Sequence, residues 1–191
     1  MFKWKIKQIK SVFLYLILSS LIVGVVCSLI FGGREIIKRE VYPQKYKMQV
    51  EQCSIKYNID KNLIYSVIKV ESNFNKNAVS NKGAMGLMQI TLDTAEYIAR
   101  LKGVEFDKSD LFNENINIDF GCYYLRYLID KFNSIETAIC AYNAGETKVR
   151  GWLKNKANSV DGKSLTFIPI NETREYLNKI QSTFAKYKKY Y

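Results

Sequence analysis

The 191-residue sequence predicts a mainly α-helical protein, with one helical domain behind a single N-terminal transmembrane helix. Residues 12–31 form twenty consecutive positions without a charge, about the length that spans a bilayer as a helix. From residue 47 onward, apolar residues recur at the three- and four-residue spacing of amphipathic helices. Convincing alternation with a period of two is missing, although 163–170 could hold a short extended piece. Because 48% of the residues are hydrophobic, the chain can form a packed core.

The N-terminal segment has the pattern of an uncleaved signal anchor. Four lysines and no acidic residue precede the apolar stretch, at positions 3, 5, 7 and 10. We therefore expect a cytoplasmic stub at 1–11, a transmembrane anchor at 12–31 and a stalk at 32–46. Basic residues also follow the stretch, so the charge count alone leaves the orientation open. A cleaved signal peptide, cut near Cys27, is the alternative, but the apolar run continues through Phe31.

The remaining segment, 47–191, is predicted to fold as a set of amphipathic helices. The first helix carries an apolar stripe formed by Tyr46, Val50, Cys53 and Tyr57. Later helices are expected to begin at residues whose side chains cap helix N-termini, namely Asp60, Thr91, Asn113, Ser134 and Asn171.

The composition excludes several kinds of chemistry. The chain contains no histidine, which removes Ser–His and Cys–His nucleophile pairs and the commonest metal ligand. Hydrolytic or lyase chemistry would have to rest on carboxylates, tyrosine, lysine or an unpaired thiol, and no metal or organic cofactor is predicted. The net charge of +11 comprises +6 before residue 47 (eight basic, two acidic) and +5 after it (21 basic, 16 acidic). The charge suits an anionic partner such as a cell wall or nucleic acid, but compact basic clusters interleaved with aromatic residues are missing, so no nucleic acid is expected.

The four cysteines do not form a metal or redox motif, because no two are separated by only two residues. Cys27 lies in the apolar stretch. Cys53, Cys122 and Cys140 are expected to be small apolar core residues on helices, with one disulfide among them left open.

Glu71 is the first candidate for chemistry. It lies four residues after Val67 and seven after Ile64, so a helix would place its carboxyl group on the apolar stripe. Burial disfavours the charged form and keeps such a group protonated at higher pH. A protonated carboxyl near neutral pH is what glycosidic bond cleavage requires of its general acid. The ordinary alternative is a solvated glutamate at the end of a helix.

Two further segments carry polar groups next to glycines. Residues 80–90 contain two glycines at a turn, followed by an apolar stretch with Gln89 inside it. Residues 141–145 end a predicted helix at Gly145 and leave Tyr142 and Asn143 near that end. Each of these polar side chains could bond a saccharide, or could serve only the local fold.

Together with Glu71-Ser72 and the ETREY segment at 172–176, these segments resemble the four motifs of the Slt-type lytic transglycosylases. They follow one another in the family's order, with nine residues from Glu71 to Ser80 and eighteen to Gln89. The resemblance covers about residues 50–180. It implies the lysozyme-like fold shared with goose-type lysozymes, and it makes 47–191 a catalytic domain.

The resemblance also implies roles for individual residues. Glu71 would be the single catalytic residue, acting as acid and then as base. The residues that would bind the substrate are Ser80, Met88, Gln89, Tyr142, Asn143 and Glu172. Met88 would pack against the sugar or, equally, fill the core. The amide and hydroxyl groups at 142 and 143 would orient the substrate, whereas Glu172 would lie in the cleft or support it.

The implied reaction cleaves the β-1,4 bond between N-acetylmuramic acid and N-acetylglucosamine without water and leaves 1,6-anhydro ends. The partner would be the peptidoglycan glycan strands. The protein would lie in the bacterial membrane as a single-pass chain, with the catalytic domain facing the wall. A hydrolytic lysozyme with a second acid (Asp93, Glu96 or Asp107) is one alternative. A non-catalytic wall-binding module is another, and partners in envelope assembly remain open.

Overall fold

The computed structural model describes residues 2–191, and it describes side chains from residue 14 onward. The chain divides into two compact units, Met1–Pro43 and Gln44–Tyr191. The side chains of the predicted stub and the first two positions of the predicted anchor lie outside the described residues.

The first unit is one long helix, α1 (Phe2–Ile36), continued by a π-helical turn, η1 (Ile37–Val41). The stretch Leu14–Val41 is long and apolar enough to cross a membrane, with a mean hydropathy of 2.6 in its most apolar part. None of that part is buried within the structure. A signal sequence has the same length and composition, so the observation supports a membrane-directed segment without choosing between the two.

The second unit is mainly helical, and the predicted fold class is confirmed. Among residues 44–191 the extended pairing consists of isolated bridges, Val79 with Met85 and Met85 with Ile90, rather than strands. The piece at 163–170 forms no strand; turns around Asp161 precede it. The helices are α2 (Lys47–Tyr57), α3 (Lys61–Ser72), α4 (Leu92–Lys102), η2 (Lys108–Phe112), α5 (Glu114–Phe132), α6 (Ile135–Ala144), α7 (Glu146–Leu153) and α8 (Asn171–Tyr190).

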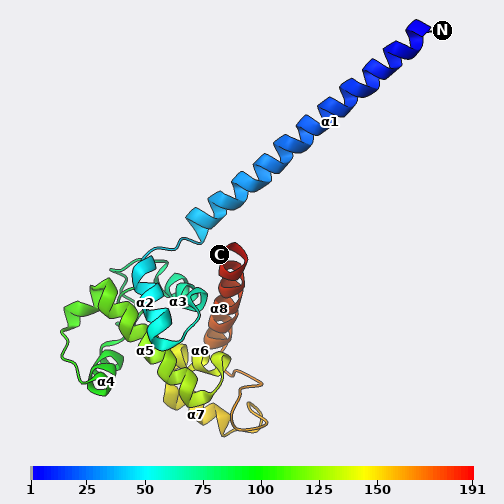
Figure 1. The fold of residues 1–191 in the computed structure, drawn as a ribbon. Coiled ribbons are helices and arrows are strands. Elements are labelled where there is room, and N and C mark those ends of the chain that lie inside the picture. Colours follow the sequence, from blue (N-terminus) through cyan, green and yellow to red (C-terminus); the bar gives the residue numbers. More distant parts are fainter. Residues whose placement is uncertain (1) are drawn as a thin grey trace. The chain divides into compact units, whose positions relative to one another are not determined.

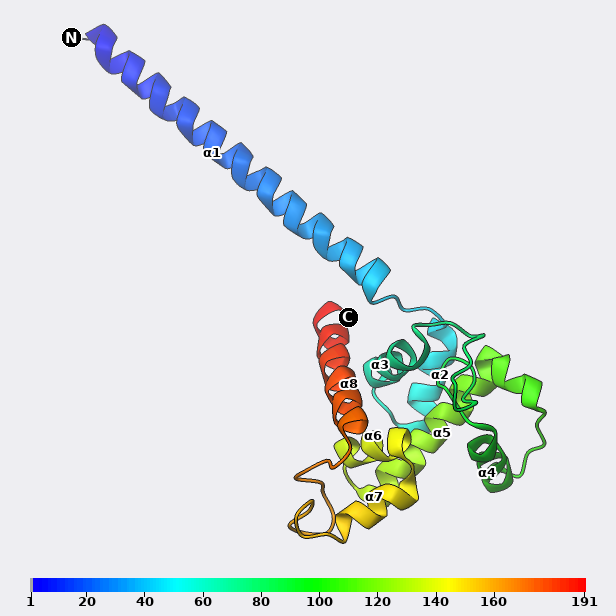
Figure 2. The same cartoon turned by 180° about the vertical axis from the view of Figure 1, so that it is seen from behind.

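Helix α5 is the centre of this unit. It packs against α2, α4 and α6, while α3 packs against α8 (Figures 1 and 2). The apolar face of α5 is fully buried at Ile118, Leu125 and Leu128. Such burial removes apolar surface from water and is the main stabilising contribution to a helical domain of this kind.

Most helix starts lie where the sequence predicts them. Asp60 accepts a hydrogen bond from the backbone N–H of Asn62 at the start of α3, and Thr91, Asn113 and Ser134 cap their helices similarly. The last helix differs by one residue. Ile170 precedes α8 without a side-chain cap, and Asn171 is the first helical residue, where its amide donates to Glu175 at 2.7 Å.

The loop between α3 and α4 rests directly on the backbone of α5. A Cβ atom at Gly121 would lie 2.3 Å from the sulfur of Met88, so only glycine permits this approach. One turn earlier, Asn117 donates to the carbonyls of Met85 and Leu111 and accepts from the N–H of Met88 at 2.8 Å. A buried amide with all its groups bonded in this way holds the loop in one position.

Candidate active site

Glu71 lies in the last turn of α3, at the point where α3 meets α8. Its carboxylate is half-buried, and the hydroxyl of Tyr176 on α8 donates a hydrogen bond to Oε1 at 2.5 Å. Tyr176 itself is buried. The packing of these two helices therefore sets the surroundings of the carboxyl group.

The environment of Glu71 raises its pKa to about 7. Burial is the cause, because it disfavours the charged carboxylate. The hydrogen bond from Tyr176 opposes this effect and lowers the pKa, because it stabilises the carboxylate. Among the described residues, no lysine or arginine forms an ion pair with this carboxylate, and no second carboxylate shifts its pKa. Near neutral pH the group can therefore both give and take a proton.

The loop of residues 80–90 lies beside Glu71 and is fastened to α3. The hydroxyl of Ser72, the neighbour of Glu71, donates to the carbonyl of Leu87 at 2.8 Å. Gln89 has a left-handed backbone with φ of 49°, and its side-chain amide nitrogen donates to the carbonyls of Ala78 and Gly86. The nitrogen of that amide thus shapes the loop, which leaves the carbonyl oxygen as the group that can meet a ligand.

Ser80 closes a turn at the start of this loop. Its Oγ accepts from the backbone N–H of Ala84 at 3.0 Å, and its own N–H donates to the Ala84 carbonyl at 2.9 Å. The side chain is half-buried, so the hydroxyl proton can still be donated outward.

The end of α6 joins the loop to α8. The hydroxyl of Tyr142 donates to the carbonyl of Met88 at 2.8 Å, and Oδ1 of Asn143 accepts from the hydroxyl of Thr173 at 2.8 Å. Burial raises the pKa of Tyr142 well above its ordinary value, and the nearby negative charge of Glu71 raises it further. Tyr142 therefore stays neutral beside Glu71.

Two of the predicted substrate-binding side chains differ from the others in their exposure. Met88 has no exposed surface, because it packs against Gly121 on α5, so in this structure its side chain supports the loop from within. Glu172 is exposed in the first turn of α8, where it forms an ion pair with Lys82 of the loop at 3.1 Å. That pair joins α8 and the loop at the rim of the site.

Tyr176 is the site residue that sequence reasoning placed only on the apolar face of the last helix. A signal was available, because it ends the ETREY segment that carries the family resemblance. Its contact with Glu71 joins residues 105 positions apart, which no local pattern reveals.

Residues 48–164 match the family model of the transglycosylase SLT domain. The chain belongs to this family. The resemblance stated from the motifs is thereby confirmed, and the lysozyme-like fold expected of SLT domains agrees with the helical architecture.

The chain is similar in sequence to several lytic murein transglycosylases. The membrane-bound lytic murein transglycosylase C of Photorhabdus laumondii is 35% identical over 166 residues, which cover 75% of this chain and 46% of the relative. The soluble lytic murein transglycosylase of Escherichia coli is 31% identical over 153 residues, covering 78% of this chain and 24% of the relative. The chain thus spans less than half the length of these curated relatives.

Solved structures of lytic transglycosylases match most of this chain. An inactive mutant of the lytic transglycosylase Slt from Pseudomonas aeruginosa matches with a TM-score of 0.69 and 27% identity, over 81% of this chain and 25% of that one. The 70 kDa soluble lytic transglycosylase of Escherichia coli matches with a TM-score of 0.68 and 28% identity, over 77% and 24%. A complex of the 70 kDa soluble enzyme with bulgecin A matches equally well.

Proposed function

We propose that this chain is a membrane-anchored lytic transglycosylase that cleaves the β-1,4 bond between N-acetylmuramic acid and N-acetylglucosamine in peptidoglycan. The observation that carries the proposal is the pKa of about 7 at Glu71, a lone carboxyl with one phenolic partner. The names of its relatives, lytic murein transglycosylases, support the substrate class.

The proposed reaction uses one carboxyl group twice. Protonated Glu71 donates its proton to the oxygen of the leaving sugar, and the substrate's acetamido group stabilises the positive charge at the anomeric carbon. The carboxylate then takes the proton of the muramic acid 6-hydroxyl, whose oxygen closes the 1,6-anhydro ring. Tyr176 stabilises the carboxylate between the two steps through its hydrogen bond at 2.5 Å.

The remaining polar groups would position the strand. We assign the side-chain carbonyl of Gln89 and the hydroxyl of Ser80, both on the loop that Ser72 fastens to α3, to the sugar hydroxyl and acetamido groups. Tyr142 and Asn143 would act mainly by holding the loop and α8 in place, because both are engaged in hydrogen bonds within the protein. Glu172 would close the rim with Lys82.

The N-terminal segment would tether this activity to the membrane. We propose that 12–31 spans the bilayer, with 1–11 in the cytoplasm, 32–46 as a stalk and 47–191 facing the wall. The apolar stretch Leu14–Val41 and the membrane-bound relatives support the tether.

The test is mass spectrometry of fragments that the full-length chain, in detergent, releases from purified sacculi. We expect disaccharide-peptides with 1,6-anhydro ends, and release from the Glu71→Gln variant that is slower by at least about a hundredfold. Fragments heavier by one water at each cut would establish a hydrolytic lysozyme instead. Binding to sacculi without any release would establish a wall-binding module and would overturn the proposal.

A further inference from the structure

Cys53 on α2 and Cys122 on α5 form a pair of thiols across the packed interface of these helices. Helix α2 packs against α5, and the side-chain interaction of the two thiols lowers the pKa of Cys53 and raises that of Cys122, so the two groups are neighbours. Both thiols are buried, with 6% of Cys53 and none of Cys122 exposed. The structure shows them in the free, reduced form. Their contact is a feature of this chain that the proposed glycan chemistry does not use.

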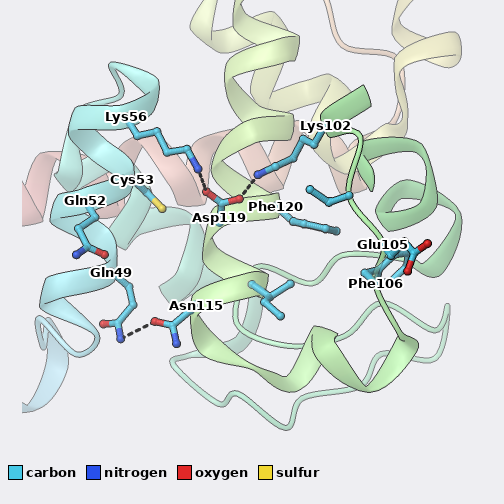
Figure 3. A pocket seen from close by; sticks show the side chains of 12 residues that line it. Gln49, Gln52, Cys53, Lys56, Lys102, Glu105, Phe106, Asn115, Asp119 and Phe120 are labelled. Carbon is cyan, nitrogen blue, oxygen red and sulfur yellow. Dashed lines mark hydrogen bonds and ion pairs between the residues drawn. The ribbon is translucent and has the colours of Figure 1, made fainter. Parts of the chain in front are cut away.

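A cavity of about 540 Å³ gives access to this pair from one side. It lies between α2, the segment after α4 and the first half of α5, and Cys53 is part of its wall (Figure 3). Phe106 and Phe120 supply apolar surface to the wall, and Gln49, Gln52 and Asn115 add side-chain amides to it. Cys122 is absent from the wall. A molecule in the cavity can therefore reach the first thiol directly and the second only through it.

The charges around the cavity favour the thiolate of Cys53. Lys56 and Lys102 both form ion pairs with Asp119, which also accepts from the hydroxyl of Tyr57 (Figure 3 shows the two lysines). The hydrogen bond from Cys122 lowers the pKa of Cys53 most, the two lysines lower it further, and burial and Asp119 oppose them. The net direction is downward. Burial instead raises the pKa of Cys122.

The third buried cysteine of this unit differs in both respects. Cys140 on α6 lies outside the cavity, and burial raises its pKa to about 12. Reactive thiols in proteins combine access, nearby positive charge and a lowered pKa, and inert ones lack these features. Cys53 has the first set of properties and Cys140 the second.

We propose that Cys53 and Cys122 are a redox-active thiol pair, oxidised to a disulfide by a small-molecule disulfide that enters this cavity. The Cys53 thiolate attacks one sulfur of the small disulfide, forms a mixed disulfide and releases the first small thiol. The Cys122 thiol gives up its proton to the departing thiolate and attacks the Cys53 sulfur, which releases the second small thiol. Two protein thiols lose two electrons and two protons, and the small disulfide is reduced to two thiols.

The new bond would join α2 to α5 and close a loop that contains α3, Glu71 and the whole of residues 80–90. Constraining so long a loop stabilises a fold mainly by limiting the unfolded chain. The oxidised form should therefore resist unfolding of the part of the chain that carries Glu71. This inference is independent of the proposed function, because it concerns thiols that the glycan does not meet.

The experiment treats the reduced full-length chain, in detergent, with excess glutathione disulfide and maps its cysteines by mass spectrometry without reduction. We expect a cross-linked peptide pair containing Cys53 and Cys122, a mass loss of two hydrogen atoms, and a melting temperature higher by about 5–10 °C. Cys140→Ser is the matched control, because it removes a buried thiol outside the cavity and should leave the cross-link unchanged.

Two variants test the order of the steps. In Cys122→Ser, Cys53 should retain one glutathionyl group, at a rate at least about tenfold above that of Cys140. In Cys53→Ser, Cys122 should remain unmodified. Absence of the cross-link in the natural sequence, equal reaction of Cys140, or modification of Cys122 without Cys53 would each overturn the proposal. The first of these outcomes needs no variant to fold, and none of them depends on wall cleavage.

Discussion

Two half-buried carboxyl groups in this domain have opposite properties. Glu71 accepts one hydrogen bond, from Tyr176, and its pKa rises to about 7 because burial is the larger effect. Asp119 is also penalised by burial, but it receives hydrogen bonds from Lys56, Lys102 and a tyrosine hydroxyl. Its pKa is lowered as a result.

The comparison shows that burial alone does not decide the charge of an acid in this fold. What differs is the number and charge of the donors that face it. One neutral phenol leaves Glu71 able to hold a proton near neutral pH, whereas two ammonium groups keep Asp119 ionised. We therefore expect the first carboxyl to serve chemistry and the second to serve structure.

The largest expected difference lies in turnover. Glu71→Gln should lower the rate of glycan release by about a hundred- to ten-thousand-fold, because a general acid contributes that much. Asp119→Asn should change the rate by less than about threefold when equal amounts of folded protein are compared, because Asp119 takes no part in the proposed reaction. Initial rates on purified sacculi, with circular dichroism to confirm folding, measure both. Equal losses in the two variants would remove the distinction.

The second difference is in the pH dependence of stability. Glu71 titrates near 4.5 in the unfolded chain and near 7 in the folded one, so between these values only the unfolded state loses the proton. The free energy of unfolding of the natural chain should therefore fall relative to Glu71→Gln by up to about 3 kcal/mol as pH rises from 4.5 to 7. Denaturant titrations at several pH values measure it. Parallel curves for the two proteins would contradict the raised pKa.

The third prediction concerns the stability contributed by Asp119. Asp119→Asn leaves two lysines facing a neutral amide in a partly buried site and should lower the free energy of unfolding by about 1–3 kcal/mol. Because the pKa of Asp119 is lowered, this contribution is present above the unfolded value and disappears as the pH falls through the folded one. Urea unfolding of both proteins at neutral and acidic pH tests this. A loss that stays the same in acid would argue against the ion pairs as its cause.

The smallest effect is expected at Tyr176, whose hydroxyl lowers the pKa of Glu71. Tyr176→Phe keeps the ring and removes the hydroxyl, so the pKa of Glu71 should rise by about one unit. The rate should fall about tenfold, since the carboxylate loses its stabilising donor. The alkaline limb of the pH–rate profile should move to higher pH. A lower rate with an unmoved limb would assign the tyrosine a packing role only.

The sequence predicts well what depends on neighbours along the chain. The caps at Asp60 and Thr91 act within one turn, and the stripe of Ile64 and Val67 places Glu71 toward the interior because helical spacing alone decides it. The motifs then identify the family correctly.

What the sequence leaves open depends on how distant helices pack. The bond of Tyr176 to Glu71 requires that α8 lie on α3, and the cluster around Asp119 draws its groups from α2, α4 and α5. Met88 shows the same limit, because apolar side chains suit a core and a sugar equally. Only the approach of α5 at Gly121 places it in the core.

The lack of a side chain at Gly121 limits which substitutions this chain can accept during evolution. The loop beside Glu71 approaches α5 so closely that Gly121 has room only for a hydrogen atom where other residues carry a Cβ atom. Any side chain at that position would collide with Met88 and force the loop beside Glu71 to shift, although the position lies in the middle of a core helix. A smaller side chain in place of Met88 would not restore the room, because the Cβ atom of Met88 would itself lie only 2.7 Å from a Cβ atom at 121. Glycine is therefore required at 121 whatever side chain residue 88 carries.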